Sequence, residues 1–198
     1  MPLAPPDVLA GPARWAAAAA AALALAGCSA AAPGSTASRN AAPSARTFPI
    51  AERRAAPDLT GHDLDGAALR LADQRGHVVV VNIWGSWCGP CRAEASGLQR
   101  VHADTEASGV RFLGIDTRDP DPGPARTFVR DHGLSYPSLF DPKGALVRTL
   151  PPDVVNAQAL PATLVLDRQG RIAAGVMAPL TPEELHALLD PVLAEEPA

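Results

Sequence analysis

The feature that most constrains this 198-residue chain is an apolar run that leads into a pair of cysteines. Residues 78–83 read Val-Val-Val-Val-Asn-Ile, and Trp87-Cys88-Gly89-Pro90-Cys91 follows three residues later. An apolar run without alternation predicts a strand that is covered on both faces of a sheet and has parallel neighbours. Pro90 suits the first turn of a helix, where its missing N–H is no loss. The sequence therefore predicts a central strand, a turn that carries the cysteines, and a helix.

The rest of the chain predicts alternating strands and helices. The helix after the cysteines is expected to run to about Ser108 and to stop at Gly109, and Asp63-Leu64-Asp65-Gly66 predicts a turn between short edge strands. Pro191 is expected to fray or kink the end of the last helix. The other expected elements are a strand at 110–116, a helix at 125–132 capped by Gly133, a strand pair at 138–140 and 145–148, a hairpin of 163–166 with 171–176, and a last helix that opens with a capping box at 181–184.

The cysteine pair indicates redox chemistry. Two thiols separated by two residues can close a small disulfide and reopen it, which passes two electrons to or from another protein. Cys88 falls at the expected helix N-terminus, where the helix dipole favours a thiolate. Cys91 lies one turn further in, and we expect it to be less exposed and to resolve the mixed disulfide that Cys88 forms. The expected activity is thiol–disulfide oxidoreduction by Cys88 and Cys91, with no cofactor and no metal.

The sequence leaves two other functions open. A thiol peroxidase needs a single peroxidatic cysteine in a small polar pocket, and such a pocket gives no role to Trp87 or to a nearby second cysteine. A metal-binding lipoprotein would use both cysteines as soft ligands. A zinc site would need a further pair of ligands, and the five histidines form no ligand-spaced pair.

The N-terminus predicts export. Residues 15–26 form an uncharged apolar stretch that suits the hydrophobic region of a signal peptide and is too short to span a bilayer. Leu25-Ala26-Gly27-Cys28 resembles the lipobox of bacterial lipoproteins, so residues 1–28 are expected to be a signal peptide and Cys28 the lipidated residue. The alternative is cleavage around residues 30–32, which would give a soluble secreted protein. Both interpretations place the domain outside the cytoplasm.

Composition divides the remainder in two. Residues 29–55 are rich in Ala, Pro, Ser, Gly and Arg, which predicts a flexible tether. Residues 56–198 have the length of one domain. The net charge of −4 is spread over interspersed acidic and basic residues, so the chain has no basic stripe and nucleic acid is not an expected partner.

Residues 82–94, NIWGSWCGPCRAE, resemble the active-site segment of the TlpA/ResA-like branch of the thioredoxin superfamily, which are membrane-tethered reductases outside the cytoplasm. The similarity extends from residues 56–59 through Leu160-Pro161-Ala162-Thr163 to the last helix. It implies an α/β thioredoxin fold, with a central mixed sheet, helices on both faces, an N-terminal extension and a central insertion.

The resemblance also implies site residues around the cysteines. Pro161 matches a cis-proline that faces the pair and presents the backbone of Leu160 to substrate. Trp87, Gly89 and Pro90 are the other residues expected to contact substrate.

One acidic residue is expected to act beside the thiols. Asn82 stands where classical cytoplasmic thioredoxins carry a buried aspartate, and Glu94 matches a glutamate that many relatives carry, so Glu94 is the candidate catalytic proton carrier. The alternative is a solvated helix glutamate with no role. Many relatives have a helix-kinking proline where this chain has Ser96 followed by Gly97, which makes the geometry near Glu94 the least constrained part of the comparison.

Partners follow from the same resemblance. Substrates are expected to be disulfide-containing exported proteins, with apocytochrome c as one family-type example, and electrons are expected from a membrane thiol carrier related to CcdA or DsbD. The Gly89-Pro90 dipeptide is that of thioredoxin and favours the reducing end of the range of potentials.

Overall fold

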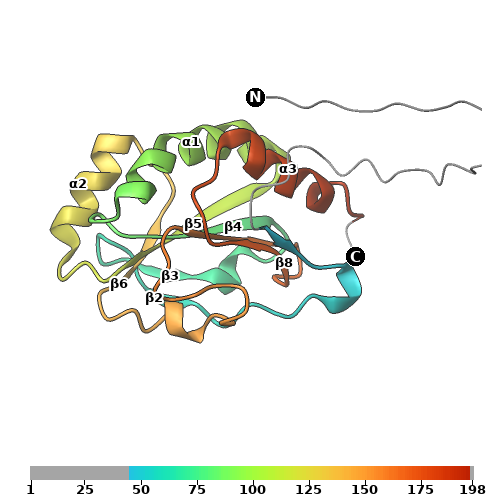
Figure 1. Cartoon of the computed structure of the whole chain (residues 1–198), viewed down its shortest axis with the longest axis horizontal. Helices are drawn as coiled ribbons and strands as arrows, with labels where there is room; N and C mark the ends of the chain where they lie inside the picture. The colour runs from blue at the N-terminus through green and yellow to red at the C-terminus, as the bar shows by residue number, and fades with distance from the viewer. Residues whose placement is uncertain (1–44, 197–198) are drawn as a thin grey trace, which may run out of the picture. The chain divides into compact units, whose positions relative to one another are not determined.

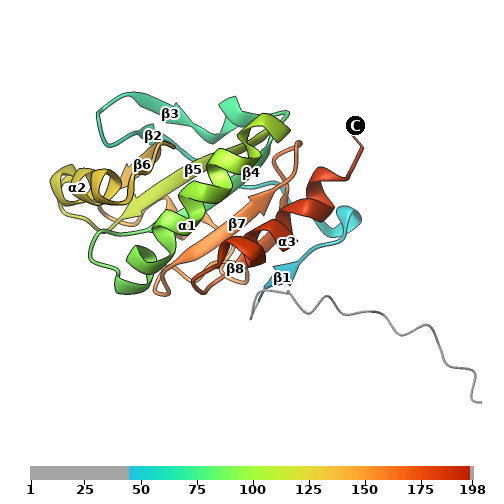
Figure 2. The same ribbon diagram turned by 90° about the horizontal axis from the view of Figure 1, so that it is seen from above.

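The computed structural model describes residues 45–196, so the predicted signal peptide and Cys28 lie outside the described residues. The centre of this part is a six-stranded mixed sheet in the order β1-β8-β7-β4-β5-β6 (Figures 1 and 2). Strands β4, β5 and β6 are parallel, β7 is antiparallel to β4, and β8 is antiparallel to β7. The strands are β1 (Arg46–Thr47), β4 (Val78–Trp84), β5 (Val110–Thr117), β6 (Ser138–Asp141), β7 (Ala162–Leu166) and β8 (Ile172–Val176).

Strand β4 is the central strand that the apolar run predicts. All seven of its residues are buried. It pairs with β5 on one side, from Val78 opposite Val110 to Trp84 opposite Asp116, and with β7 on the other. Because β4 and β5 are parallel, their carboxyl ends meet at the same end of the sheet, and the cysteines follow directly from β4.

The three α-helices lie on one face of the sheet, which is the upper face in Figure 1. Two successive right-handed crossovers, β4-α1-β5 and β5-α2-β6, advance in the same direction across the sheet, which places both helices on the same side. Alternate residues of β4, including Val78, Val80 and Trp84, pack beneath them. The helices are α1 (Gly89–Thr105), α2 (Pro122–His132) and α3 (Pro182–Leu193).

The opposite face has no α-helix among the described residues. It is covered by the hairpin of β2 (Thr60–His62) and β3 (Ala68–Arg70), by the 3₁₀ segments η2 (Leu71–Gln74) and η4 (Val147–Thr149), and by the chain that leads to β7. The thioredoxin fold is confirmed, but the expected helices on this second face are only 3₁₀ turns. The segment between β6 and β7 contains Pro151 and Pro152, which remove backbone donors and disfavour a helix.

The predicted strand at 145–148 is wrong. Its backbone instead winds around the carboxylate of Asp141, which accepts the N–H groups of Ala145 at 2.6 Å and Val147 at 3.2 Å. These donors are therefore not free for a ladder, and β6 pairs in parallel with β5. The hairpin of β7 and β8, the turn at Asp63 and the cap at Gly133 are confirmed.

The boundary of the folded domain lies earlier than composition suggests. Strand β1 pairs with β8, with Arg46 opposite Gly175, and Phe48 N–H donates to the Ala173 carbonyl at 2.8 Å. The Arg53 guanidinium, whose side chain is 6% exposed, reaches both carboxylate oxygens of Glu195 at 2.7 and 2.6 Å. Residues 46–55 therefore belong to the domain and not to a tether.

The last helix opens with the predicted capping box between Thr181 and Glu184. The predicted fraying at Pro191 is wrong, because α3 continues to Leu193. Arg168 donates to the carbonyls of Leu193 at 3.2 Å and Glu195 at 2.9 Å, which pairs groups that a helix end leaves open. Within residues 45–196, none of the helices has the length and apolar character that crossing a bilayer requires.

Candidate active site

Cys88 and Cys91 lie at the N-terminus of α1, as predicted, and are joined by a disulfide with an S–S distance of 2.01 Å. Cys88 is the N-cap residue of α1, and its sulfur accepts the Cys91 N–H at 3.2 Å. Both residues are buried, with Cys91 1% and Cys88 4% exposed. Trp87, immediately before the pair, is 52% exposed. The tryptophan side chain is therefore far more accessible than either cysteine.

Pro161 lies at the same end of the sheet as the cysteines. The Leu160–Pro161 peptide bond is cis, as predicted. Ala162 pairs with Ile83, so Pro161 falls opposite Trp84, where β4 leads into the cysteine turn. Leu160 is half-buried and packs against the apolar residues on both sides of the sheet.

Glu94 is buried on α1, one turn after Cys91. It is 5% exposed, so the alternative of a solvated helix glutamate is wrong. One carboxylate oxygen accepts from the Asn82 amide at 3.0 Å and the other from the Leu180 N–H at 2.9 Å, and Asn82 also donates to the Thr163 hydroxyl at 3.2 Å. Burial raises the pKa of Glu94 to about 7, against the opposing effect of these hydrogen bonds. The carboxyl can therefore gain or lose a proton near neutral pH.

The helix around Glu94 is continuous through Ser96 and Gly97, where many relatives carry a proline. A Cβ at Gly97 would stand 3.4 Å from the Pro182 ring, an ordinary van der Waals distance, so the start of α3 lies against α1 at this position. That approach brings the N–H of Leu180 to Glu94. The departure from the family pattern therefore leaves the surroundings of the carboxylate well defined.

Asp116 is a second buried acid, which the sequence did not predict as a site residue. It is the residue before the last of β5, opposite Trp84, and is 0% exposed, and no N–H group among residues 45–196 donates to its carboxylate oxygens. Burial raises the pKa of Asp116 to about 9, and a hydrogen bond between its protonated carboxyl group and the Asp119 carboxylate, together with the nearby charges of Asp119 and Asp141, adds to the effect. The available signal was an acidic residue directly after the apolar run 112–115.

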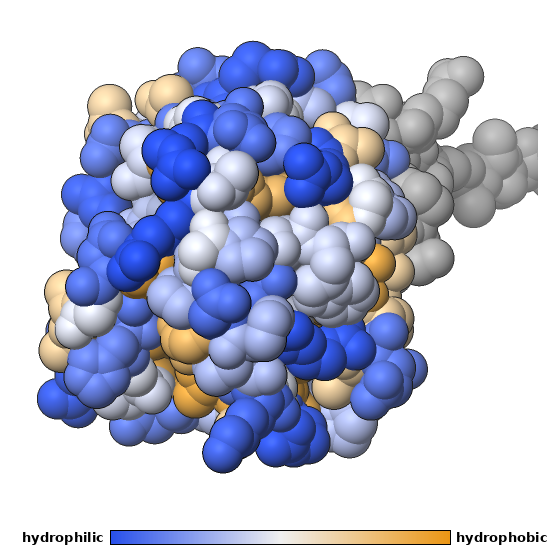
Figure 3. Space-filling model, turned by 90° about the vertical axis from the view of Figure 1, so that its left-hand side faces the viewer, coloured by the Kyte–Doolittle hydropathy of each residue, from blue (hydrophilic) through white to orange (hydrophobic). Residues whose placement is uncertain are grey.

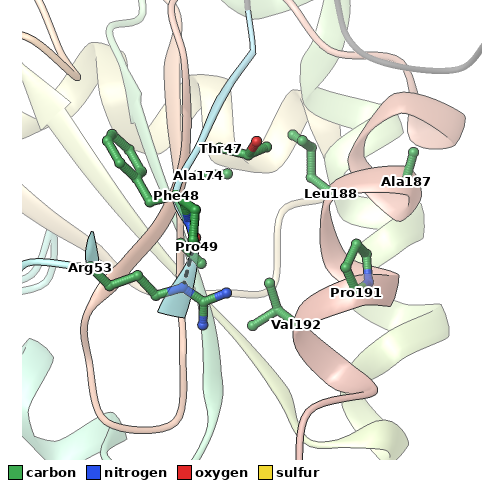
Figure 4. Close-up of a pocket in the computed structure, with 10 residues that line it drawn as sticks. Thr47, Phe48, Pro49, Arg53, Ala174, Ala187, Leu188, Pro191 and Val192 are labelled. Carbon is green, nitrogen blue, oxygen red and sulfur yellow. Dashed lines mark hydrogen bonds between the residues drawn. The ribbon is translucent and has the colours of Figure 1, made fainter. Parts of the chain in front are cut away.

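An apolar cavity beside α3 lies away from the cysteines. It has a volume of about 350 Å³ and lies between the N-terminal segment with β8 on one side and α3 on the other (Figure 4). Leu188, Pro191 and Val192 line the α3 side. Arg53, its charged lining residue, already donates to the Phe48 carbonyl at 3.1 Å and to two carboxylates. The cavity offers no free reactive group and no residue from the cysteine turn.

Among residues 45–196, no three His, Cys, Asp or Glu side chains gather in a way that could hold a metal ion. The side of the molecule that carries α2 is largely hydrophilic, with apolar residues in small separate patches (Figure 3). Contact with another protein on this side would therefore depend on few apolar side chains.

Comparisons with known proteins agree with this geometry. Residues 53–174 match the family described as the AhpC/TSA family. The thiol-disulfide oxidoreductase ResA of Bacillus anthracis is 27% identical over 134 residues, which are 68% of this chain and 74% of that protein.

Solved structures give the same assignment. A DsbF homologue from Corynebacterium diphtheriae is 33% identical with a TM-score of 0.70, over 81% of this chain and 96% of that one. A secreted thiol-disulfide isomerase from Corynebacterium glutamicum is 35% identical with a TM-score of 0.69, over 77% and 93%. With its CxxC pair at a helix N-terminus, the chain is a thiol-disulfide oxidoreductase of the thioredoxin superfamily and belongs to the AhpC/TSA family.

Proposed function

We propose that this oxidoreductase acts outside the cytoplasm and reduces disulfides in exported proteins. The observation that carries the proposal is the Cys88–Cys91 disulfide at the N-terminus of α1, beside the exposed Trp87. In the reduced enzyme, the Cys88 thiolate attacks a substrate disulfide, a mixed disulfide forms, and one substrate thiol leaves. The Cys91 thiolate then attacks Cys88, releases the second substrate thiol and closes the enzyme disulfide. Two electrons pass to the substrate.

Glu94 is proposed to exchange the proton of Cys91. The attack by Cys91 requires its thiolate, and residues three apart on a helix are neighbours. The raised pKa of Glu94, about 7, lets it accept that proton and release it near neutral pH. Asn82 cannot do so, but its amide holds the Glu94 carboxylate in place at 3.0 Å.

Substrate is proposed to bind as an extended segment next to Leu160 and Pro161. Peptide backbone can pair with the backbone before β7 as a short added strand. Trp87 supplies an exposed aromatic surface, and Gly89 and Pro90 form the open start of α1. A Cβ added at Gly89 would meet no heavy atom within 4 Å, which agrees with an approach path from this side.

Location and electron supply complete the proposal. The motif at 25–28 supports a lipid on Cys28, and the secreted isomerase of Corynebacterium glutamicum supports an extracytoplasmic site. Electrons would come from a membrane thiol carrier of the CcdA or DsbD type, and apocytochrome c is one proposed substrate. Membrane fractionation of wild type against Cys28→Ala tests the anchor, because the variant should move to the soluble fraction and an unchanged distribution contradicts lipidation.

Reduction of insulin with dithiothreitol tests the activity. Wild type should accelerate precipitation of the insulin B chain, whereas Cys88→Ser should be inactive and Cys91→Ser should accumulate mixed disulfides. Limited alkylation of the reduced protein should label Cys88 before Cys91. Hydrogen peroxide turnover without insulin reduction would indicate a thiol peroxidase, and tight copper binding without either would indicate a metal-binding lipoprotein.

A further inference from the structure

The turn that precedes the cysteines is held by the loop that follows β5. The Asp119 carboxylate accepts the Ser86 N–H at 2.9 Å and the Ser86 hydroxyl at 2.7 Å. Asp119 is 2% exposed, so these bonds are shielded from water. Arg92 Nη1 donates to the Ser86 carbonyl at 2.9 Å. The backbone of Ser86, two residues before Cys88, is therefore held on both its N–H and its carbonyl.

The same loop holds Trp87. The Arg118 guanidinium carbon lies 4.7 Å from the centroid of the Trp87 ring, within range of a cation–π interaction. Arg118 has a φ of 64°, an unusual conformation for a residue other than glycine, and its N–H donates to the Asp141 carbonyl at 3.1 Å. Asp121 caps α2 three residues later, so the loop is fixed at both ends.

The turn after β4 packs directly against the end of β5. A Cβ on Gly85 would lie 2.7 Å from Trp87 Nε1 and 3.1 Å from the Thr117 carbonyl. Glycine is therefore required where the turn after β4 passes the end of β5. This close contact makes the loop after β5 a direct support for the cysteine turn.

We propose that Asp119 is a positioning residue for thiol–disulfide exchange, acting through Ser86 on Cys88, and that Arg118 sets the orientation of Trp87 for a protein substrate. The proposal rests on the proposed function only for the choice of substrate. The bonds to Ser86 involve no sulfur, so they can persist when the disulfide opens. They would then keep Cys88 at the N-terminus of α1 in both redox states. The rate of thiol–disulfide exchange depends strongly on how accurately the attacking sulfur is placed.

The test compares two carboxylates of one loop. Asp119→Ala removes the two carboxylate oxygens that accept from the Ser86 N–H and hydroxyl groups. Asp121→Ala removes the cap of α2 and leaves the hydrogen bonds of Ser86 in place. For each variant the alkylation rate of reduced Cys88 and the kcat and KM for insulin and for a small aromatic disulfide are measured, with thermal unfolding as the check on folding. Asp119→Asn and Ser86→Ala supply milder changes if Asp119→Ala does not fold.

We expect Asp119→Ala to slow Cys88 alkylation and kcat for both substrates about tenfold. Asp119→Asn should recover most of the rate, because its amide oxygen still accepts from Ser86, and Asp121→Ala should match wild type. Arg118→Gln should raise KM for insulin only. Equal rates for Asp119→Ala and wild type, or an equal loss in Asp121→Ala, would overturn the proposal. If wild type does not reduce insulin, the proposed function fails, and the alkylation rates still decide the role of Asp119.

Discussion

Two regions on the helical side of the sheet each hold a buried carboxyl group, and they differ in how that group is paired. Around Glu94, an amide and a backbone N–H donate to the two oxygens. Around Asp116, no N–H group among residues 45–196 donates to either oxygen; its hydrogen-bonding neighbour is the Asp119 carboxylate, and Asp141 lies nearby. The pKa is raised to about 7 for Glu94 and to about 9 for Asp116.

The difference separates a group that can exchange protons from one that stays protonated. At neutral pH, Glu94 is close to its midpoint, whereas Asp116 remains neutral. Each raised pKa means that the folded state holds its proton more tightly than the unfolded state. Folding stability contributed by the protonated group is therefore lost as pH rises, between about 4.5 and 7 for Glu94 and between about 3.8 and 9 for Asp116.

The largest expected effect is on stability, at Asp116. Asp116→Asn keeps the shape of the side chain and removes the need to bury a group that is charged in the unfolded chain. At pH 8 the variant should be more stable than wild type by several kcal/mol, and near pH 4 the two should be similar. Urea unfolding at both pH values measures this, and equal stability at pH 8 would show that Asp116 is not a buried acid of high pKa.

Glu94→Gln is expected to slow insulin reduction at pH 7 by about ten- to a hundredfold, since the amide cannot exchange a proton. Asp116→Asn is the matched control, because it also replaces a buried acid by its amide and should keep the wild-type rate. Stopped-flow reduction under single-turnover conditions separates this step from reduction by dithiothreitol. A rate for Glu94→Gln equal to that of wild type would make Glu94 a structural residue only.

Asn82→Asp is expected to move the Glu94 region toward the behaviour of Asp116. The amide donor is lost and a second carboxyl group is placed at hydrogen-bonding distance from Glu94. Two neighbouring carboxyl groups cannot both ionise easily, so the midpoint of the pH–rate profile should rise by about one unit. A midpoint that falls or stays constant would contradict the assignment of the profile to Glu94.

The smallest effect is expected at Thr163. Thr163→Val removes the hydroxyl that accepts from Asn82 at 3.2 Å but leaves the contact between Asn82 and Glu94. Stability should fall by about 1 kcal/mol, with little change in rate. Thermal unfolding and insulin reduction measure the two quantities, and a large rate loss would mean that Thr163 does more than orient Asn82.

Local sequence patterns predicted most of the fold. The run at 78–83, the glycines at 109 and 133 and the capping box at Thr181 each specify an element through nearby residues, and each element is present. The two errors have different causes. At 145–148 the Asp141 side chain accepts from backbone N–H groups only four and six residues further on, which an apolar pattern does not reveal. At Pro191 the cause is long-range, because Arg168 pairs the end of α3 from 25 residues away. Composition likewise could not reveal that Arg53 pairs with Glu195, 142 residues away.

The residues of the site also fall into two groups: those that the sequence locates and those that only the fold brings together. Cys88, Cys91 and Glu94 are close in sequence on one helix, so their spacing and the family resemblance locate them. Asp119 reaches Ser86 across 33 residues, and its position in a proline-rich loop indicates only a turn. The fold is needed to bring these two segments together.

The most direct test of the central claim, that a Cys88–Cys91 dithiol works with Glu94 as its proton carrier, is the pH dependence of single-turnover insulin reduction. Wild type and Asp116→Asn should both show a transition near pH 7, and Glu94→Gln should lack it. A transition near pH 7 that persists in Glu94→Gln, or one that disappears in Asp116→Asn, would contradict the account.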